Sequence, residues 1–239
     1  MKYIFLIGIV IAVAFTSCRF VEGQTIRGNG NVNKEQRNVT GFTGVQTHGS
    51  IDIEVSQGDY KIVVESDQNI IPYIITEISG SNLIVRFKED FNGYNFSTAK
   101  VHVTAPSLTA FEVHGSGNID GNGLITDNNS MEITVSGSGD VKLDLHSPSI
   151  TSETHGSGNI TLDGETKDFS TSISGSGDVH AFGLKAESVK TSVHGSGDTE
   201  VSASQKLETG IFGSGNVDYK GTPQLNSQTH GSGSINHVN

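Results

Sequence analysis

Five histidines in a repeated setting are the residues best suited to chemistry in this sequence. His48, His114, His155, His194 and His230 each stand directly before a Gly-Ser pair. Imidazole is a frequent metal ligand and changes charge near neutral pH, so a metal-binding or pH-sensitive stripe is one interpretation. The other is a repeated corner residue with an exposed ring. We favour the second, and predict that His114, His155, His194 and His230 form an outward-facing candidate binding stripe.

The expected spacing of these histidines argues against a shared metal ion. One further copy of the repeat separates His155 from His194, which places them ~9.6 Å apart if stacked strands are ~4.8 Å apart. Zinc–nitrogen bonds are only ~2.0–2.1 Å long. One ion cannot easily bridge such a pair, so we predict no metal site and no cofactor.

A second column of polar residues follows the glycine triplets. Asp140, Asp178 and Asp198 alternate with asparagines in this column. Stacked carboxylates and amides at a corner are expected to accept hydrogen bonds from backbone amides. Bound calcium is the alternative, but calcium takes 6–8 oxygen ligands and half of this column is not acidic. The column comprises Asn118, Asp140, Asn159, Asp178, Asp198, Asn216 and Ser234.

Catalytic motifs are missing from the sequence. It contains no Gly-Lys pair of a phosphate loop, no Gly-x-Ser-x-Gly elbow and no His-Glu-x-x-His pair. Polysaccharide-cleaving β-helices need clustered carboxylates in a cleft, and repeats of 18–22 residues leave little room for cleft-forming loops. We predict no catalytic residue and no enzymatic activity, with a glycan-processing enzyme as the least favoured alternative.

Composition excludes further classes of function. The 239-residue chain has 15 basic and 26 acidic residues, for a net charge of −11. A chain this acidic, without a basic run, is a poor nucleic-acid binder. Its single cysteine cannot form an internal disulfide.

The N-terminus has the features of an export signal. Lys2 precedes an apolar run over residues 4–15, which is too short to span a bilayer but suits a signal peptide. Small residues just before Cys18, directly after that run, resemble a bacterial lipobox. The resemblance implies cleavage after residue 17 and lipid attachment at Cys18, anchoring the protein to the outer membrane on its periplasmic or its cell-surface face. A plain secretory signal is the alternative.

The rest of the chain is repetitive. Seven Gly-Ser-Gly triplets recur every 18–22 residues, and apolar residues alternate on either side of them. A fixed period with alternating strands is typical of a solenoid whose repeats stack. We therefore predict an all-β parallel β-helix (β-solenoid) with glycines at its corners. Each repeat is expected to be a strand, a Gly-Ser-Gly corner, a second strand and a loose return. The predicted corner residues are Gly115, Gly117, Gly137, Gly139, Gly156, Gly158, Gly175, Gly177, Gly195, Gly197, Gly213, Gly215, Gly231 and Gly233.

Hydroxyl residues occupy the middle inward position of successive repeats. We expect them to stack as an internal ladder in a narrow core. The ladder comprises Ser152, Thr171, Thr191, Thr209 and Ser227.

We expect three regions after the signal peptide of residues 1–17. Residues 18–36 are a polar, turn-rich, flexible tether, and residues 37–239 are the head. Within the head, 111–239 carry the repeats and 37–110 form an irregular, widened β segment that starts the same solenoid. A separate N-terminal sandwich is the alternative for 37–110.

Further motifs give the repeats a family resemblance. Residues 39–45 read Val-Thr-Gly-Phe-Thr-Gly-Val, residues 51–58 read Ile-Asp-Ile-Glu-Val-Ser-Gln-Gly, and a strand ends in Ala-Pro-Ser-Leu over 105–108. With the serial triplets, residues 37–238 resemble the family called putative auto-transporter adhesin, head GIN domain, common in Bacteroidota envelope proteins. The resemblance implies a β-helical, secreted or lipid-anchored protein, and it supplies no catalytic residues.

These observations predict a non-enzymatic envelope lipoprotein whose rigid surface binds a glycan or a protein. The alternative is a structural protein whose solenoid ends stack into homo-oligomers or filaments. The membrane, through Cys18, is an expected partner in both cases.

Overall fold

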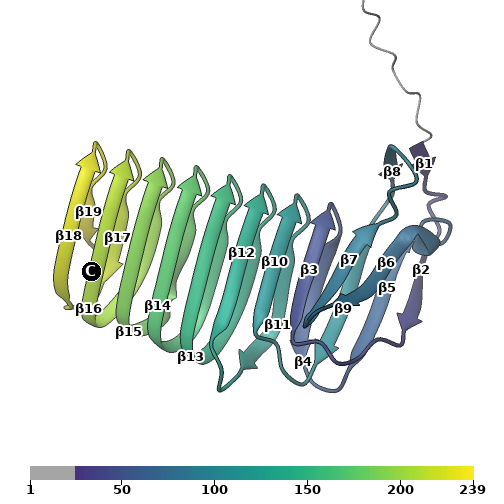
Figure 1. Cartoon of the computed structure of the whole chain (residues 1–239), viewed down its shortest axis with the longest axis horizontal. Helices are drawn as coiled ribbons and strands as arrows, with labels where there is room; N and C mark the ends of the chain where they lie inside the picture. Colours follow the sequence, from purple (N-terminus) through teal and green to yellow (C-terminus); the bar gives the residue numbers. More distant parts are fainter. Residues whose placement is uncertain (1–24) are drawn as a thin grey trace, which may run out of the picture.

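Parallel coils stacked along one axis form the body of the molecule (Figure 1). The computed structural model describes residues 25–239. In each coil, one strand runs into a Gly-Ser-Gly corner and a second strand leaves it. The corner glycines of successive coils pair in register, as Gly137 does with Gly156 and Gly156 with Gly175. The predicted all-β parallel β-helix is therefore confirmed.

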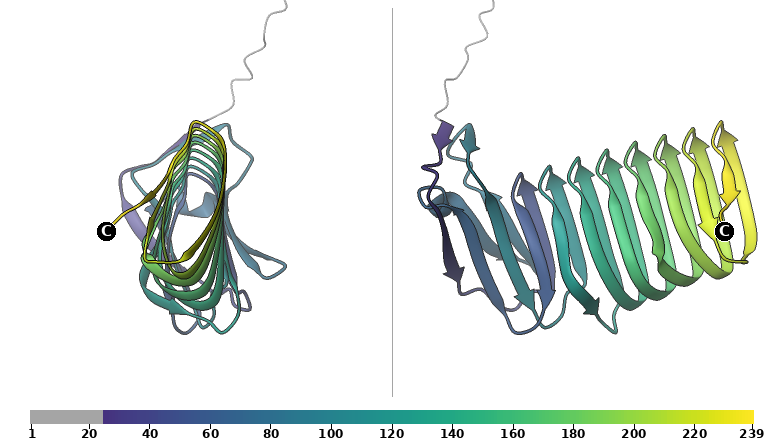
Figure 2. Two further views of the ribbon diagram at one scale, coloured as in Figure 1. Left: turned by 90° about the vertical axis from the view of Figure 1, so that its left-hand side faces the viewer. Right: turned by 180° about the vertical axis from the view of Figure 1, so that it is seen from behind.

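The middle coils are more regular than the sequence predicted. We expected a loose return between repeats, but here single strands cover nearly a whole turn, and the view along the rod shows a flattened tube (Figure 2). The segment that returns from one corner to the next stays in strand form because its backbone groups pair with those of the next coil. The pairing is interrupted at Pro148, which has no N–H to donate. These long strands are β13 (Val141–Gly156), β14 (Ile160–Gly175), β15 (Val179–Gly195) and β16 (Thr199–Gly213).

Shorter strands complete the coils at either end of this regular part. Their parallel pairing continues the same sheet, with β10 on β12 and β16 on β18. The strands are β10 (Ala110–Gly115), β11 (Ile119–Thr126), β12 (Met131–Gly137), β17 (Val217–Lys220), β18 (Gln224–Gly231) and β19 (Ile235–His237).

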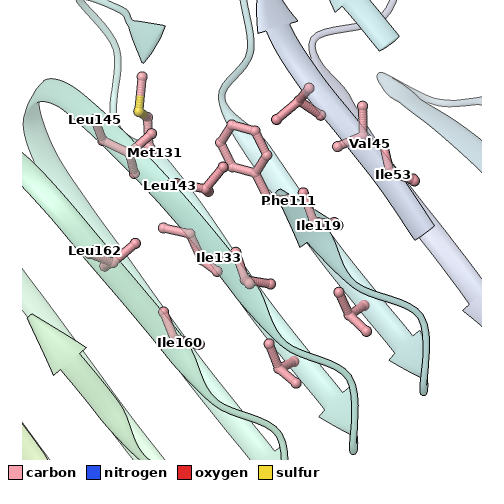
Figure 3. Close-up of a cluster of buried hydrophobic side chains, with 14 of the residues drawn as sticks. Val45, Ile53, Phe111, Ile119, Met131, Ile133, Leu143, Leu145, Ile160 and Leu162 are labelled. Carbon is pink, nitrogen blue, oxygen red and sulfur yellow. The ribbon is translucent and has the colours of Figure 1, made fainter. Parts of the chain in front are cut away.

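Alternate residues of each strand point into the tube and form one continuous core (Figure 3). Phe111, Ile133 and Leu162 are at most 1% exposed. Burying an aliphatic or aromatic side chain of this size contributes about 1.5–3 kcal/mol. No coil can bury this face alone, so each coil depends on its neighbours for stability.

The corner glycines are required by close backbone approach. Gly175 has φ +146°, and a Cβ there would collide with the carbonyl oxygen of Gly156 in the preceding coil. Gly177 has no positive φ, but its Cβ would collide with the carbonyl oxygen of Gly158. The first glycine of a triplet thus supplies the turn, and the second supplies the space between coils.

The two predicted polar ladders are present. Ser152 donates a hydrogen bond to Thr171 over 2.8 Å, and Thr191 donates to Thr209 over 2.7 Å, inside the tube. Ser227 is an exception, because it lies on the exposed strand β18. At the corner, each side-chain oxygen accepts the backbone N–H of the next coil at 2.7–3.0 Å. The acceptors are Asp52, Asn118, Asp140, Asn159, Asp178, Asp198 and Asn216.

The N-terminal segment begins the same sheet. β3 (Gly44–Gly49) and β4 (Asp52–Gln57) pair in parallel with β10 and β11, and His48 lies opposite His114. Antiparallel pairs β5–β9 and β6–β7 then widen this end of the rod. The remaining elements here are β5 (Lys61–Asp67), the 3₁₀ turn η1 (Ile71–Tyr73), β6 (Ile74–Ser79), β7 (Asn82–Phe87) and β9 (Ala99–Ala105).

The expected tether is wrong from Thr25 onward. β1 (Thr25–Arg27) pairs with β8 (Gly93–Asn95), and β2 (Val32–Arg37) pairs antiparallel with β5. β2 is exposed along almost its whole length, so it has no buried face and no apolar alternation to reveal it in the sequence. The signal peptide, Cys18 and the first residues of the tether lie outside the described residues.

Candidate functional site

One flat face of the rod carries the predicted histidine stripe. It is built by the parts of the strands that run into the corners, and their outward side chains form three columns. The column nearest the corner holds the five histidines that precede Gly-Ser, and serine or phenylalanine fills its other positions. Its members, in coil order, are His48, His114, Ser136, His155, Ser174, His194, Phe212 and His230.

The spacing within this column differs from one end to the other. Ser174 separates His155 from His194, as the repeat count predicted. His48 and His114, in contrast, lie in adjacent coils with ring centroids 5.0 Å apart. The prediction that the rings stand apart is therefore wrong for this pair, because residues 50–110 form no complete coil between them.

Sequence reasoning missed a three-ring stack at the other end. The Phe212 ring lies between the His194 ring, at 4.7 Å and 9°, and the His230 ring, at 5.3 Å and 17°. Phe212 is 42% exposed, which makes it one of the few large apolar side chains open to solvent in residues 25–239. The signal was Phe212 itself, in a column otherwise made of histidine and serine.

His48, in the histidine pair at the N-terminal end, has a lowered pKa. Burial, followed by the neighbouring His114 and Arg86, lowers the pKa of His48 below its ordinary value, and Glu112 partly opposes this. His48 is therefore held in its neutral form over part of the range in which a free histidine is charged.

A second polar cluster lies on β2, β4, β5 and β9. His102 contacts Glu54 through Nδ1 at 3.3 Å and Glu65 through Nε2 at 2.9 Å, and Lys34 pairs with Glu65 at 3.0 Å. The hydrogen bond from His102, and then that from Lys34, lowers the pKa of Glu65. The charges of this cluster are satisfied internally, which fits a role in joining the widened end to the first coil.

Neither the acidic corner residues nor the histidines assemble into a metal centre in the described part of the chain. No group of three or more His, Cys, Asp or Glu residues within 25–239 could hold a metal ion. Asp140, Asp178 and Asp198 each use Oδ1 to accept a backbone N–H. These oxygens are therefore committed to the ladder.

A shallow hollow interrupts the flat face beside the ring stack. It is lined by outward side chains of β15, β16 and β18, and Gly210 lies among them with no side chain of its own. Phe212 forms one wall, and Lys190, Glu208, Asn226 and Gln228 surround the rest. The hollow combines one apolar ring with amide, hydroxyl and charged groups, so it is more polar than most small-ligand sites.

The family of the chain follows from its repeats. A family model described as putative auto-transporter adhesin, head GIN domain matches residues 41–223. The chain belongs to this family. The family model ends before the last coil. It covers the first coil and most of the ring-bearing face of this head GIN domain.

Solved structures share the fold of this head GIN domain. A putative adhesin from Bacteroides fragilis aligns with a TM-score of 0.84 and 22% identity, over 89% of this chain and 100% of its own. A putative lipid binding protein from Parabacteroides distasonis aligns with a TM-score of 0.75 and 28% identity, over 90% of this chain and 100% of its own. A putative adhesin from Parabacteroides merdae aligns with a TM-score of 0.69 and 24% identity, over 90% of this chain and 99% of its own. No curated protein matches the sequence.

Residues 25–239 contain no helix that is long and apolar enough to cross a bilayer.

Proposed function

We propose that this head GIN domain is a non-enzymatic, lipid-anchored module of the cell envelope that presents a rigid β-solenoid face to a glycan or a protein. The observation that carries the proposal is the flat face itself, with its exposed ring stack and adjoining hollow. Its side chains are fixed by parallel strands in register on both sides. A surface held this firmly loses little conformational entropy when it binds.

The rest of the molecule supports binding rather than catalysis. The carboxylates of the His102 cluster are paired with cations or imidazole, and those of the corner ladder accept backbone amides. The names of the family and of two structural relatives point to adhesion, and the name of a third relative points to lipid binding. An acyl chain requires an apolar cavity, whereas the hollow beside Phe212 is lined mostly by polar side chains.

Anchoring is the second part of the proposal. Cys18 follows a signal-like apolar run and is the only cysteine of the chain. Multiple acyl chains on that residue would hold the protein stably on a membrane, since each buried methylene contributes ~0.8 kcal/mol. The head would then project from the outer membrane.

The test uses the head, residues 23–239, which contains every described strand and the whole core. Its mass is measured by light scattering over a range of concentrations, and the same protein is applied to a glycan array. We expect array binding by a monomer. Release of reducing sugar from envelope or dietary polysaccharides would contradict the non-enzymatic assignment.

Self-association is a second candidate function, favoured by the last coil. β18 is exposed along its whole length and Leu225 is 41% exposed. Residues 221–239 contain no Asp, Glu, Lys or Arg, although charges on an edge strand are a common protection against edge pairing. A mass that rises with concentration in the absence of ligand, without array binding, would support this candidate over the first.

A further inference from the structure

Gly210 is an unusual residue for its place in the sheet. It lies in the middle outward column, directly between Ser192 and Gln228 in unbroken parallel register. From β10 onward, every other member of this column carries a side chain. The column comprises Glu112, Thr134, Glu153, Ser172, Ser192, Gly210 and Gln228.

The backbone does not require a glycine at this position. Gly210 is not among the glycines with positive φ. A Cβ would meet only the end of the Phe212 ring, with Cε2 at 3.3 Å and Cζ at 4.0 Å, and no backbone atom. The corner residue Gly213 differs, because its Cβ would collide with the carbonyl oxygen of Gly195.

A glycine that the fold does not need is costly in a strand. Relative to alanine it destabilises the strand by about 0.5–1 kcal/mol. Glycine inside a strand marks a bulge, a tight bend, or a place where a ligand or another backbone approaches closely. Pairing around Gly210 shows no register shift, and no backbone atom of a neighbouring coil lies within 4 Å of its Cβ position. Close approach of a ligand is the case that remains, and the hollow above Gly210 is where it would bind.

The size and charge of the hollow restrict the ligand. Its volume is about 190 Å³, below the ~300–1,000 Å³ of clefts that enclose a drug-sized molecule. Lys190 and Glu208 are the charged residues of its lining, and they pair at 3.6 Å, so their charges cancel. The site therefore suits a single small ring without a strong net charge.

The hydrogen-bonding groups around the hollow suit a hydroxyl-rich ligand. Asn226 and Gln228 are exposed, and their amides can each donate and accept. Ser192 and Glu208 add a hydroxyl and a carboxylate. Hydroxyl groups both donate and accept, so they complement this mixture better than a purely anionic or cationic group would.

Phe212 adds an apolar wall. Both faces of its ring are covered by His194 and His230, which leaves its edge open beside Gly210. Saccharide rings have apolar C–H surfaces together with polar hydroxyls. We propose that the hollow over Gly210 binds one ring of a neutral saccharide, with its C–H surface against Phe212 and its hydroxyls on Asn226, Gln228 and Glu208. This inference rests on the proposed binding function and names its ligand class.

The experiment fills the hollow without disturbing the fold. Gly210→Thr places a β-branched side chain over the strand, and the end of the Phe212 ring can move outward to accept it. Ser172→Thr is the control, since it places the same threonine side chain in the same column two coils away, where the wild type already has a side chain. A second variant, Asn226→Ala with Gln228→Ala, removes exposed amides and does not depend on how Gly210→Thr packs.

The probe is a glycan array of neutral oligosaccharides, followed by titration of the strongest binder. We expect wild type and Ser172→Thr to bind alike, and Gly210→Thr and the double variant to bind at least ten-fold more weakly with unchanged or higher melting temperature. Wild-type binding that survives in a folded Gly210→Thr would overturn the site but leave the proposed function standing. An array on which wild type binds nothing would overturn the saccharide assignment and the glycan form of the proposed function together.

Discussion

The ring of His194 lies 4.7 Å from the ring of Phe212, with only 9° between their planes. The coil spacing imposes this contact, because the two residues occupy the same column in adjacent, registered strands. Parallel solenoids hold like positions ~4.7–4.9 Å apart, which is also a favourable stacking distance for aromatic rings. A column of rings therefore stacks wherever two neighbouring coils both supply one.

This contact predicts a difference between two histidines of the stripe. His194→Ala removes a ring from the stack and should lower the free energy of unfolding by about 0.5–1 kcal/mol, the lower part of the range for aromatic pairs. His155→Ala is the control, because Ser136 and Ser174 are its column neighbours, and it should change stability by less than ~0.5 kcal/mol. Denaturant unfolding measures both, and equal effects would contradict the account of the stack.

A chelator should leave the melting temperatures of both variants unchanged.

The corners predict a larger effect. Gly175→Val places a Cβ against the carbonyl oxygen of Gly156 at φ +146°, and strain of this kind costs on the order of 1–3 kcal/mol. At roughly 2–4 °C per kcal/mol for a domain of this size, the melting temperature should fall by several degrees. Ser176→Ala at the exposed neighbour should have almost no effect. Similar melting temperatures for the two variants would remove the role assigned to the corner glycine.

The His48–His114 pair predicts a dependence on pH. The pKa of His48 is lowered from 6.5 in the folded protein, so the unfolded chain takes up a proton first as the pH falls. The stability contributed by neutral His48 is complete above pH 6.5 and is lost below it, down to the folded pKa. The melting temperature should therefore fall less between pH 7.5 and pH 5.5 in His48→Gln than in wild type. An identical fall in both proteins would show that His48 does not contribute.

The solenoid could be predicted because its cause repeats in the sequence. Each Gly-Ser-Gly triplet indicates the same steric requirement, and each member of the Asn/Asp column indicates the same hydrogen bond. Seven repeats, each a weak signal alone, therefore predict the same coil. Asp52 extends this ladder to the first coil, where the triplet has degenerated to Gly49-Ser50-Ile51. Repetition compensates for the low information content of any single Gly-Ser-Gly.

Features that occur once could not be predicted in the same way. His102 contacts Glu65, 37 positions away, across the antiparallel pair β5–β9, and Glu54, 48 positions away, across the parallel pair β4–β9. No repeat in the sequence reveals either pairing. The hollow depends on Gly210 together with side chains from two neighbouring strands. Nothing in the sequence distinguishes Gly210 from the other glycines of the chain. β2 buries almost none of its side chains, so its sequence carries no alternation of apolar and polar residues.

The anchor predicts a change in location. Cys18→Ala removes the proposed site of lipid attachment, so the variant should leave the membrane fraction or retain its signal peptide. Fractionation with mass measurement of the mature N-terminus distinguishes these results from wild type. A processed Cys18→Ala protein that stays on membranes would contradict lipid anchoring, whatever the head binds.

The most direct test of the central claim is the stoichiometry with which the monomeric head, residues 23–239, binds an oligosaccharide selected on the array. Titration calorimetry at neutral pH gives this value, and chromatography of the recovered ligand shows whether it is intact. The account predicts saturable binding of one oligosaccharide per chain, with the ligand unchanged. Failure to saturate with any arrayed oligosaccharide, or recovery of a shortened ligand, would contradict it.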